Sequence, residues 1–157
     1  MFSIAFWISL CLDCKRKESK INLSFPYETF ADDHCETPLE AYEHIKPILR
    51  RIAKKLLGRK KSKSLKIYDP YYCDGGMIEK LHQLGFPHVY NKKEDCYAIW
   101  KANVKDLPDF DVCVTNPPYS GNHIEKLISF VTGDSFSNRP WLLLMVSLQF
   151  TLEYGFN

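Results

Sequence analysis

Hydrophobic residues along this chain follow two patterns that alternate from one segment to the next. In one pattern, apolar side chains recur every three or four residues, which is typical of amphipathic helices. It predicts helices over residues 38–57, 77–84, 97–104 and 124–131. In the other, short apolar runs lack polar alternation and predict strands buried on both faces, over residues 112–115 and 141–148. Two further short strands are predicted over residues 65–68 and 88–91. The alternation predicts an α/β fold with a mostly parallel sheet and helices on both faces.

The first predicted helix has clear boundary signals. Thr37 is expected at the cap, Pro38 at the first helical position and Glu40 three residues after the cap. Gly58 should end this helix. Pro47 lies inside it and is expected to kink the helix or split it in two.

A glycine turn follows the first predicted strand. The strand ends at Asp69-Pro70, and Gly75-Gly76 opens the next helix, which is the first unit of a nucleotide-binding α/β fold. The phosphate-binding GxGxxG and P-loop patterns are absent, and an acidic strand end disfavours a phosphate. The turn is better suited to the amino group or hydroxyls of a cationic cofactor that has no phosphate.

The third predicted strand, residues 112–115, runs directly into Asn116-Pro117-Pro118-Tyr119. Two prolines cannot donate backbone hydrogen bonds to a neighbouring strand, so the strand should end there. This stiff loop should therefore lie at the carboxyl end of a central strand, where ligands bind in α/β sheets. An Asn carbonyl and a proline carbonyl can accept both N–H bonds of an exocyclic amino group. Tyr119 offers a flat face for stacking on a heteroaromatic ring.

This loop resembles the catalytic motif of S-adenosylmethionine-dependent amino-methyltransferases. Members of that family methylate adenine N6, cytosine N4 or, in one branch, a glutamine amide. The resemblance implies that Asn116 and the Pro117 carbonyl hold the target amino group, that Pro118 stiffens the loop and that Tyr119 stacks on the base. Because a paired base would have to be flipped out of the duplex, a single-stranded target would need less unstacking and unpairing energy.

Two upstream segments resemble cofactor motifs of the same family. Asp69-Pro70-Tyr71 and Gly75-Gly76 are similar to Asp-Pro-Phe-x-Gly-x-Gly, with a shifted glycine register and Cys73-Asp74 in part of the turn. Thr37-Pro38 resembles the N-terminal cofactor motif, and the motif order is that of the γ-type enzymes. The implied ligand is S-adenosylmethionine, bound by Thr37, Pro38, Asp69, Pro70, Tyr71, Gly75, Gly76, Asn91 and Asp95.

The middle of the chain is shorter than the family pattern. Asn91 stands where the family usually has an acidic residue for the cofactor ribose, and Asp95-Cys96-Tyr97 resembles the motif that contacts the adenine. The interval 91–111 is too short for a full helix-strand-helix, so one βα unit is expected to be compressed or missing. The family sheet also ends in a β-hairpin, which the nine residues after 148 cannot build.

Composition adds modest constraints. A chain of 157 residues with 45% hydrophobic and 25% charged residues is typical of one globular domain, expected here over 25–157 after an N-terminal extension, 1–24. The net charge of +2 neither requires nor excludes nucleic acid. A basic segment over 50–63 is interpreted as a solvated helix end and linker in preference to a phosphate-contacting patch. The apolar residues 2–12 are too few to cross a membrane.

Six irregularly spaced cysteines suggest reduced thiols in a soluble intracellular protein, in the cytoplasm or nucleus. Cys11, Cys14, His34 and Cys35 could form a zinc set, but chance spacing is preferred and no metal is expected. His82 and His123 are expected on helix surfaces, and the remaining cysteines in the core.

The sequence thus predicts methyl transfer to an amino group of a nucleic-acid base, most simply adenine N6 in DNA or RNA. Cytosine N4 and a protein glutamine amide remain alternative targets. A non-catalytic or truncated methyltransferase-like binding module is the alternative of a different class. No target-recognition region is visible, so an active form would use a protein partner or the basic segment to hold its substrate.

Overall fold

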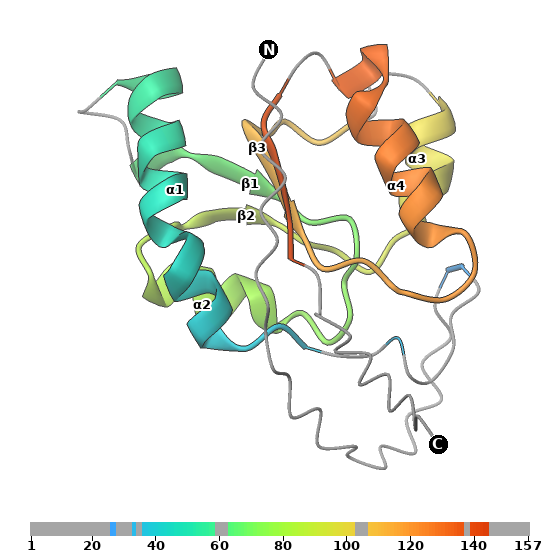
Figure 1. Cartoon of the computed structure of the whole chain (residues 1–157), viewed down its shortest axis with the longest axis horizontal. Helices are drawn as coiled ribbons and strands as arrows, with labels where there is room; N and C mark the ends of the chain where they lie inside the picture. The colour runs from blue at the N-terminus through green and yellow to red at the C-terminus, as the bar shows by residue number, and fades with distance from the viewer. Residues whose placement is uncertain are drawn as a thin grey trace, which may run out of the picture.

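The computed structural model of the chain describes residues 26–27, 33, 36–58, 63–102, 107–136 and 139–144. Within them, four helices and four strands alternate from α1 to β4, as the hydrophobic pattern predicts (Figure 1). The α/β fold class is confirmed. Residues 1–24, the possible zinc ligands Cys11, Cys14, His34 and Cys35, and the end of the 141–148 run lie outside the described residues.

Each predicted element is found close to its predicted position. The helices are α1 (Leu39–Leu57), α2 (Gly76–Gln83), α3 (Cys96–Ala102) and α4 (His123–Thr132). The strands are β1 (Lys66–Tyr68), β2 (His88–Tyr90), β3 (Val112–Thr115) and β4 (Trp141–Leu143). A short 3-10 helix, η4 (Asp134–Phe136), lies between α4 and β4.

The strands form one parallel sheet in the order β2-β1-β3-β4. The chain moves outward from β1 to β2, returns to the other side of β1 as β3, and continues outward to β4. The direction of winding therefore reverses between β1 and β3, which is the topological switch point of a Rossmann-like sheet. In the described part of the interval between β2 and β3, α3 is the only helix and no strand is present, consistent with a shortened middle.

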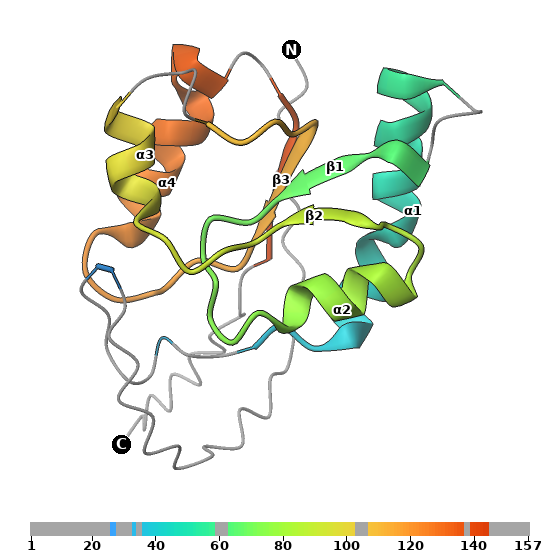
Figure 2. The same cartoon turned by 180° about the vertical axis from the view of Figure 1, so that it is seen from behind.

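Helices cover both faces of the sheet, with α1 and α2 on one side and α3 and α4 on the other (Figures 1 and 2). Successive residues of β3 point to opposite faces. Val112 and Val114 join the core under α1 and α2, whereas Cys113 joins the core under α3 and α4. All four residues of β3 are buried, as its unbroken apolar sequence predicts.

Pro47 does not split α1, contrary to one of the two predicted outcomes. The helix runs unbroken from Leu39 to Leu57 and buries Ile45 and Leu49 against the sheet. Pro47 lies on its exposed side, next to the exposed Glu43. The Glu43 carbonyl, which loses its usual N–H partner to the proline, can therefore be hydrated by solvent.

None of the described helices is both long enough and apolar enough to cross a membrane.

Candidate functional site

The two loops singled out in the sequence meet at the switch point. Asp69 directly follows β1, and Asn116 directly follows β3. Thr115, the last residue of β3, donates its hydroxyl to Asp69 Oδ1 at 2.5 Å and so joins the two strand ends. The carboxyl edge of a parallel sheet at its switch point is where such folds bind ligands.

Asp69 is a buried carboxyl group, only 6% exposed. Its Oδ1 also accepts a hydrogen bond from the Tyr71 backbone N–H at 3.0 Å. Burial raises the pKa of Asp69 to about 7; the bonds from Thr115 and Tyr71 lower this pKa, and the charge of Glu36 raises it. Asp69 therefore changes charge near neutral pH.

Asn91, at the end of β2, has an unsatisfied buried oxygen. Its Nδ2 donates to the carbonyls of Asp69 at 3.3 Å and Tyr71 at 3.1 Å, which sets the orientation of the amide. Its Oδ1 is buried and has no hydrogen-bond partner within the described residues. A buried acceptor left unpaired costs about 1–3 kcal/mol, so a ligand hydroxyl or amino group here would be stabilising.

The glycine turn keeps two left-handed residues at the spacing of the family motif. Cys73 has φ 48° and Gly75 has φ 80°. Counted from Asp69, these are the two glycine positions of Asp-Pro-Phe-x-Gly-x-Gly. Cys73, at the position of the first glycine in that motif, thus adopts a backbone conformation that glycine favours.

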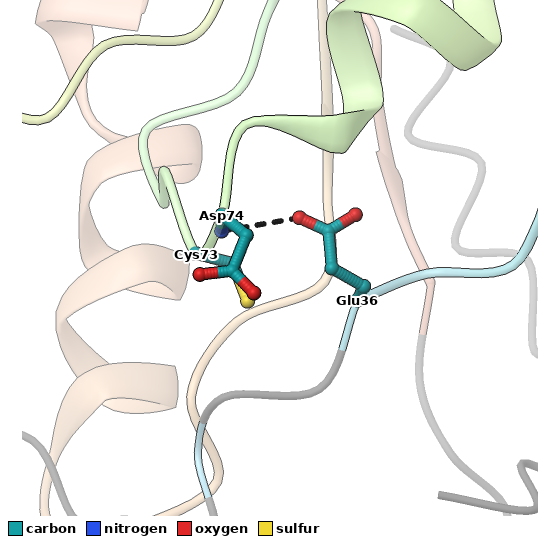
Figure 3. Close-up of side chains that lie close together, drawn as sticks. All are labelled: Glu36, Cys73 and Asp74. Atoms are coloured by element: carbon teal, nitrogen blue, oxygen red, sulfur yellow. Dashed lines mark hydrogen bonds between the residues drawn. The ribbon is translucent and has the colours of Figure 1, made fainter. Parts of the chain in front are cut away.

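The Glu36 carboxylate binds this turn, a role that no local sequence pattern indicates. Its Oε1 accepts the backbone N–H of Asp74 at 3.1 Å (Figure 3) and that of Gly76, also at 3.1 Å. Its Oε2 lies 2.7 Å from the Lys80 ammonium. A Cβ atom on Gly76 would overlap Glu36 Oε2, so a larger residue there would displace this carboxylate. The positive end of α2 is thus occupied by a carboxylate of the chain itself.

Thr37 does not cap α1, because the helix begins one residue later than predicted. Pro38 holds the N-cap position, with no side-chain cap hydrogen bond. Thr37 is buried, and its carbonyl accepts a hydrogen bond from Lys80 Nζ at 2.7 Å. Lys80 therefore binds both Glu36 and Thr37, which holds the start of α1 against the glycine turn.

The side chains of Glu36, Cys73 and Asp74 come together at this turn (Figure 3). One ligand atom of each lies within 4.8 Å of the others, a grouping that the sequence did not predict. The Lys80 ammonium already neutralises Glu36. Burial and the Glu36 charge raise the pKa of Cys73 to about 12, so its thiol is protonated at neutral pH.

The Asn116–Tyr119 loop presents its two polar side chains toward solvent. Pro117 and Pro118 are buried, Asn116 is half-buried, and Tyr119 is 36% exposed. The Tyr119 hydroxyl donates to Asn116 Oδ1 at 2.7 Å. The oxygen predicted to accept a target amino group is therefore held by the phenol, and an incoming amino group would replace that bond.

Asp33 holds the other end of this loop. Its Oδ1 accepts the backbone N–H groups of Tyr119 and Ser120, both at 3.1 Å, and its Oδ2 accepts the Ser120 hydroxyl. Asp33 lies three residues before Glu36 in the sequence. Even in fully extended chain, the Cα atoms of two residues at this spacing are at most about 11 Å apart. Because Asp33 contacts the Asn116–Tyr119 loop and Glu36 contacts the glycine turn, the two loops lie within the reach of one small ligand.

An aromatic cluster lies beside these loops, under α3 and α4. The hydroxyls of Tyr71 and Tyr97 are 3.1 Å apart, and Tyr97 is hydrogen bonded to His123 Nδ1. His123 is 6% exposed, so its predicted surface position is wrong. As the first residue of α4 it faces Tyr97 instead of solvent, a consequence of tertiary packing that helical spacing does not reveal.

The remaining predicted cofactor residues have structural contacts. Pro70 is buried directly after Asp69, and the Tyr71 ring is only 5% exposed within the aromatic cluster. Asp95 Oδ1 accepts the Ala98 backbone N–H at 3.0 Å and so caps the start of α3. The structure therefore places Asp69, Asn91 and the glycine turn at the switch point, and gives Asp95 a capping bond.

The basic segment lies away from these loops. Helix α1 begins at the glycine turn and ends just before β1 begins, so Arg50, Arg51, Lys54 and Lys55 lie toward the amino end of the sheet (Figure 1). Residues 59–62 lie outside the described residues.

Comparison of the chain with family models, curated protein sequences and solved structures gives no match. Its function must therefore be inferred from the residues at the switch point and their geometry.

Proposed function

We propose that this chain is an S-adenosylmethionine-dependent methyltransferase that acts on an exocyclic amino group of a nucleic-acid base, with adenine N6 as the preferred target. The observation that carries the proposal is the hydrogen bond between Thr115 and Asp69. It joins a candidate cofactor loop and an Asn-Pro-Pro-Tyr loop that are 46 residues apart in the sequence.

The residues at the switch point suit the proposed cofactor. Asn91 Oδ1 is a buried acceptor without a hydrogen-bond donor among the described residues, and a ribose hydroxyl would donate to it. Asp69 offers a carboxylate to a cationic amino group, and its ionised form would be favoured by that contact. The carboxylate of Glu36 fills the helix end that other nucleotide-binding folds use for phosphate, which fits a phosphate-free cofactor.

Catalysis in this proposal depends on positioning. Asn116 Oδ1 and the Pro117 carbonyl accept the two N–H bonds of the target amino group, which directs the nitrogen lone pair away from the loop. Tyr119 releases Asn116 and stacks on the base. When bound, S-adenosylmethionine supplies an electrophilic methyl group. The buried prolines and the Asp33 contacts keep the acceptors in place, so little reorganisation is needed.

Titration calorimetry with S-adenosylmethionine is the first test. We expect binding by the intact chain and a loss of at least tenfold in affinity for Asp69→Asn. Asp134→Asn, which removes the same charge from the surface after α4, should bind like the wild-type chain. If the wild-type chain does not bind the cofactor, the proposed function is wrong.

Transfer of a radiolabelled methyl group to DNA, RNA and protein pools is the second test, because it identifies the substrate. Asn116→Ala should reduce transfer by about 10²-fold or more without a change in cofactor affinity, since it removes an acceptor for the target amino group. The matched control is Gln83→Ala, which deletes an exposed amide on α2. Cofactor binding without transfer to any pool would instead support the non-catalytic binding module.

A further inference from the structure

Two adjoining cavities form a groove beside the Asn116–Tyr119 loop, on the side of α3 and α4. One, of about 270 Å³, is lined by residues 120–123 together with Tyr27, Tyr97 and Lys126. The other, of about 290 Å³, lies between α3 and α4 and is also lined by Tyr97 and Lys126. The two cavities share Tyr97 and Lys126 in their linings, and together they are called here the α3–α4 groove.

The α3–α4 groove combines aromatic walls with positive charge. Tyr97, Trp100 and Phe130 line its outer part, together with Lys101 and Lys126. Trp100 stacks on Phe130 at a centroid distance of 4.2 Å, and the Lys126 ammonium lies 4.5 Å from the centre of the Tyr97 ring. Among the described residues that line the two cavities, none is acidic. The groove is therefore electrostatically suited to a polyanion.

The groove begins at the Asn116–Tyr119 loop itself. Ser120, which lines the inner cavity, directly follows Tyr119 and is held by Asp33. From there the groove follows α4, whose ten residues extend about 15 Å at about 1.5 Å per residue. A molecule that lies in the groove would therefore have one end next to the residues assigned to the target base.

We propose that the α3–α4 groove holds the single-stranded nucleic acid that flanks the target base. The exposed lysines contact phosphates, and the half-buried rings of Tyr27 and Trp100 contact bases or sugars, which is the usual composition of a single-strand groove. This inference rests on the proposed function and extends it by naming the substrate as a single strand and giving its path. It also replaces the basic segment, which lies at the other end of the sheet, as the source of phosphate contacts.

Fluorescence anisotropy with labelled single strands of DNA and RNA, about 12 nucleotides long, tests the groove without the cofactor. The test variant is Lys101→Gln with Lys126→Gln, two exposed positions where the fold should be retained. We expect its Kd to rise on the order of tenfold at low salt. The slope of log Kd against log salt concentration should fall by about 1.4, because each phosphate that a lysine no longer neutralises on a single strand lowers it by about 0.7.

The control variant is Arg50→Gln with Lys54→Gln, which removes the same charge from the exposed side of α1. Its Kd and salt slope should remain close to the wild-type values. Equal losses in both double variants would mean that net charge alone attracts the strand, and the groove inference would be wrong. The inference is equally overturned if an acidic peptide of matched charge competes as well as an oligonucleotide, or if neither strand binds.

The two proposals fail separately. Cofactor binding with an unchanged oligonucleotide Kd in the Lys101/Lys126 variant would reject the groove and leave the proposed methyltransferase intact. Oligonucleotide binding that depends on these lysines, together with no cofactor binding, would place a strand in the groove and reject the methyltransferase.

Discussion

Asp69 couples the folding of the chain to its candidate chemistry. It is a carboxyl group in a buried position, with hydrogen bonds from Thr115 and Tyr71 that do not fully offset its loss of hydration. A cation bound beside it would favour the ionised form. The same burial that raises the pKa of Asp69 thus prepares it for a positively charged ligand.

We predict that chain stability falls as pH rises from about 4 to about 7. The pKa of Asp69 is about 7 in the folded state and about 3.9 in the unfolded chain, so the folded state binds this proton more tightly. The stabilisation that this difference gives the folded state is fully present below the unfolded pKa and is lost as the pH rises through the folded pKa. Urea unfolding at about pH 5 and about pH 8 should show a loss on the order of a few kcal/mol, and Asp69→Asn should remove this component.

Cofactor affinity should change in the opposite direction. Because ionised Asp69 attracts a cationic amino group, we expect S-adenosylmethionine to bind more tightly at about pH 8 than at about pH 6. Calorimetry at both values measures this change. A constant affinity in the wild-type chain would mean that Asp69 does not contact the charged group.

Glu36 should contribute to stability through its contacts at the glycine turn. Glu36→Ala removes the acceptor of two backbone N–H groups and leaves Lys80 without its carboxylate partner. We expect a loss of about 1–3 kcal/mol in the free energy of unfolding, measured by urea denaturation. Glu79→Ala, which removes an exposed carboxylate from the same helix as Lys80, should change it by less than about 0.5 kcal/mol.

At the residue scale, the sequence identified Asp69, Asn91 and Asn116 because each directly follows an apolar strand. It did not identify Glu36 or Asp33, since their importance comes from contacts made 38 to 87 residues away. It also placed His123 on the surface, because the spacing of apolar residues in α4 does not show which neighbour covers the first turn. Polar contacts between distant segments leave no local signal.

At the scale of elements, α1 contains a proline without being divided by it. The exposed position of Pro47 limits its cost to the lost backbone hydrogen bond and to local strain. Pro47→Ala should therefore raise the free energy of unfolding by about 1–3 kcal/mol, because it restores the bond to Glu43. Lys46→Ala, at the neighbouring position of the helix, should leave it within about 0.5 kcal/mol in the same denaturation experiment.

Element positions were predictable because their patterns are local. β3 and β4 lack polar alternation since they are buried on both faces, and the helices show their buried stripe every three or four residues. The start of α1 was misplaced by one residue. Thr37 has the chemistry of a cap, but its carbonyl is bound by Lys80, which lies 43 residues later.

At the scale of the whole molecule, ligand binding at the switch point should stabilise both layers of the fold. A ligand that binds only the folded state at about a hundredfold excess over its Kd adds about 2.7 kcal/mol. We predict an increase of this size with S-adenosylhomocysteine, measured by urea unfolding. Asn116→Ala should retain it, because Asn116 is assigned to the substrate, whereas Asp69→Asn should lose it.

The strand order shows that the two candidate loops meet, which the sequence alone could not indicate. The motif order implied a cofactor loop before a catalytic loop, but the placement of β3 beside β1 determines that they meet. Such pairing depends on the packing of four helices over the sheet, which no single segment encodes. The same holds for the α3–α4 groove, whose lining residues come from both helices, from the chain on either side of α4 and from Tyr27.

The Glu36 carboxylate also has a consequence for selectivity. Because it is tethered to the chain, it competes for the start of α2 at an effective concentration in the millimolar range or above. A free anion with the same intrinsic affinity must exceed that concentration to displace it. The turn therefore disfavours weakly binding phosphates, and the proposed cofactor would be selected by its contacts with Asp69 and Asn91.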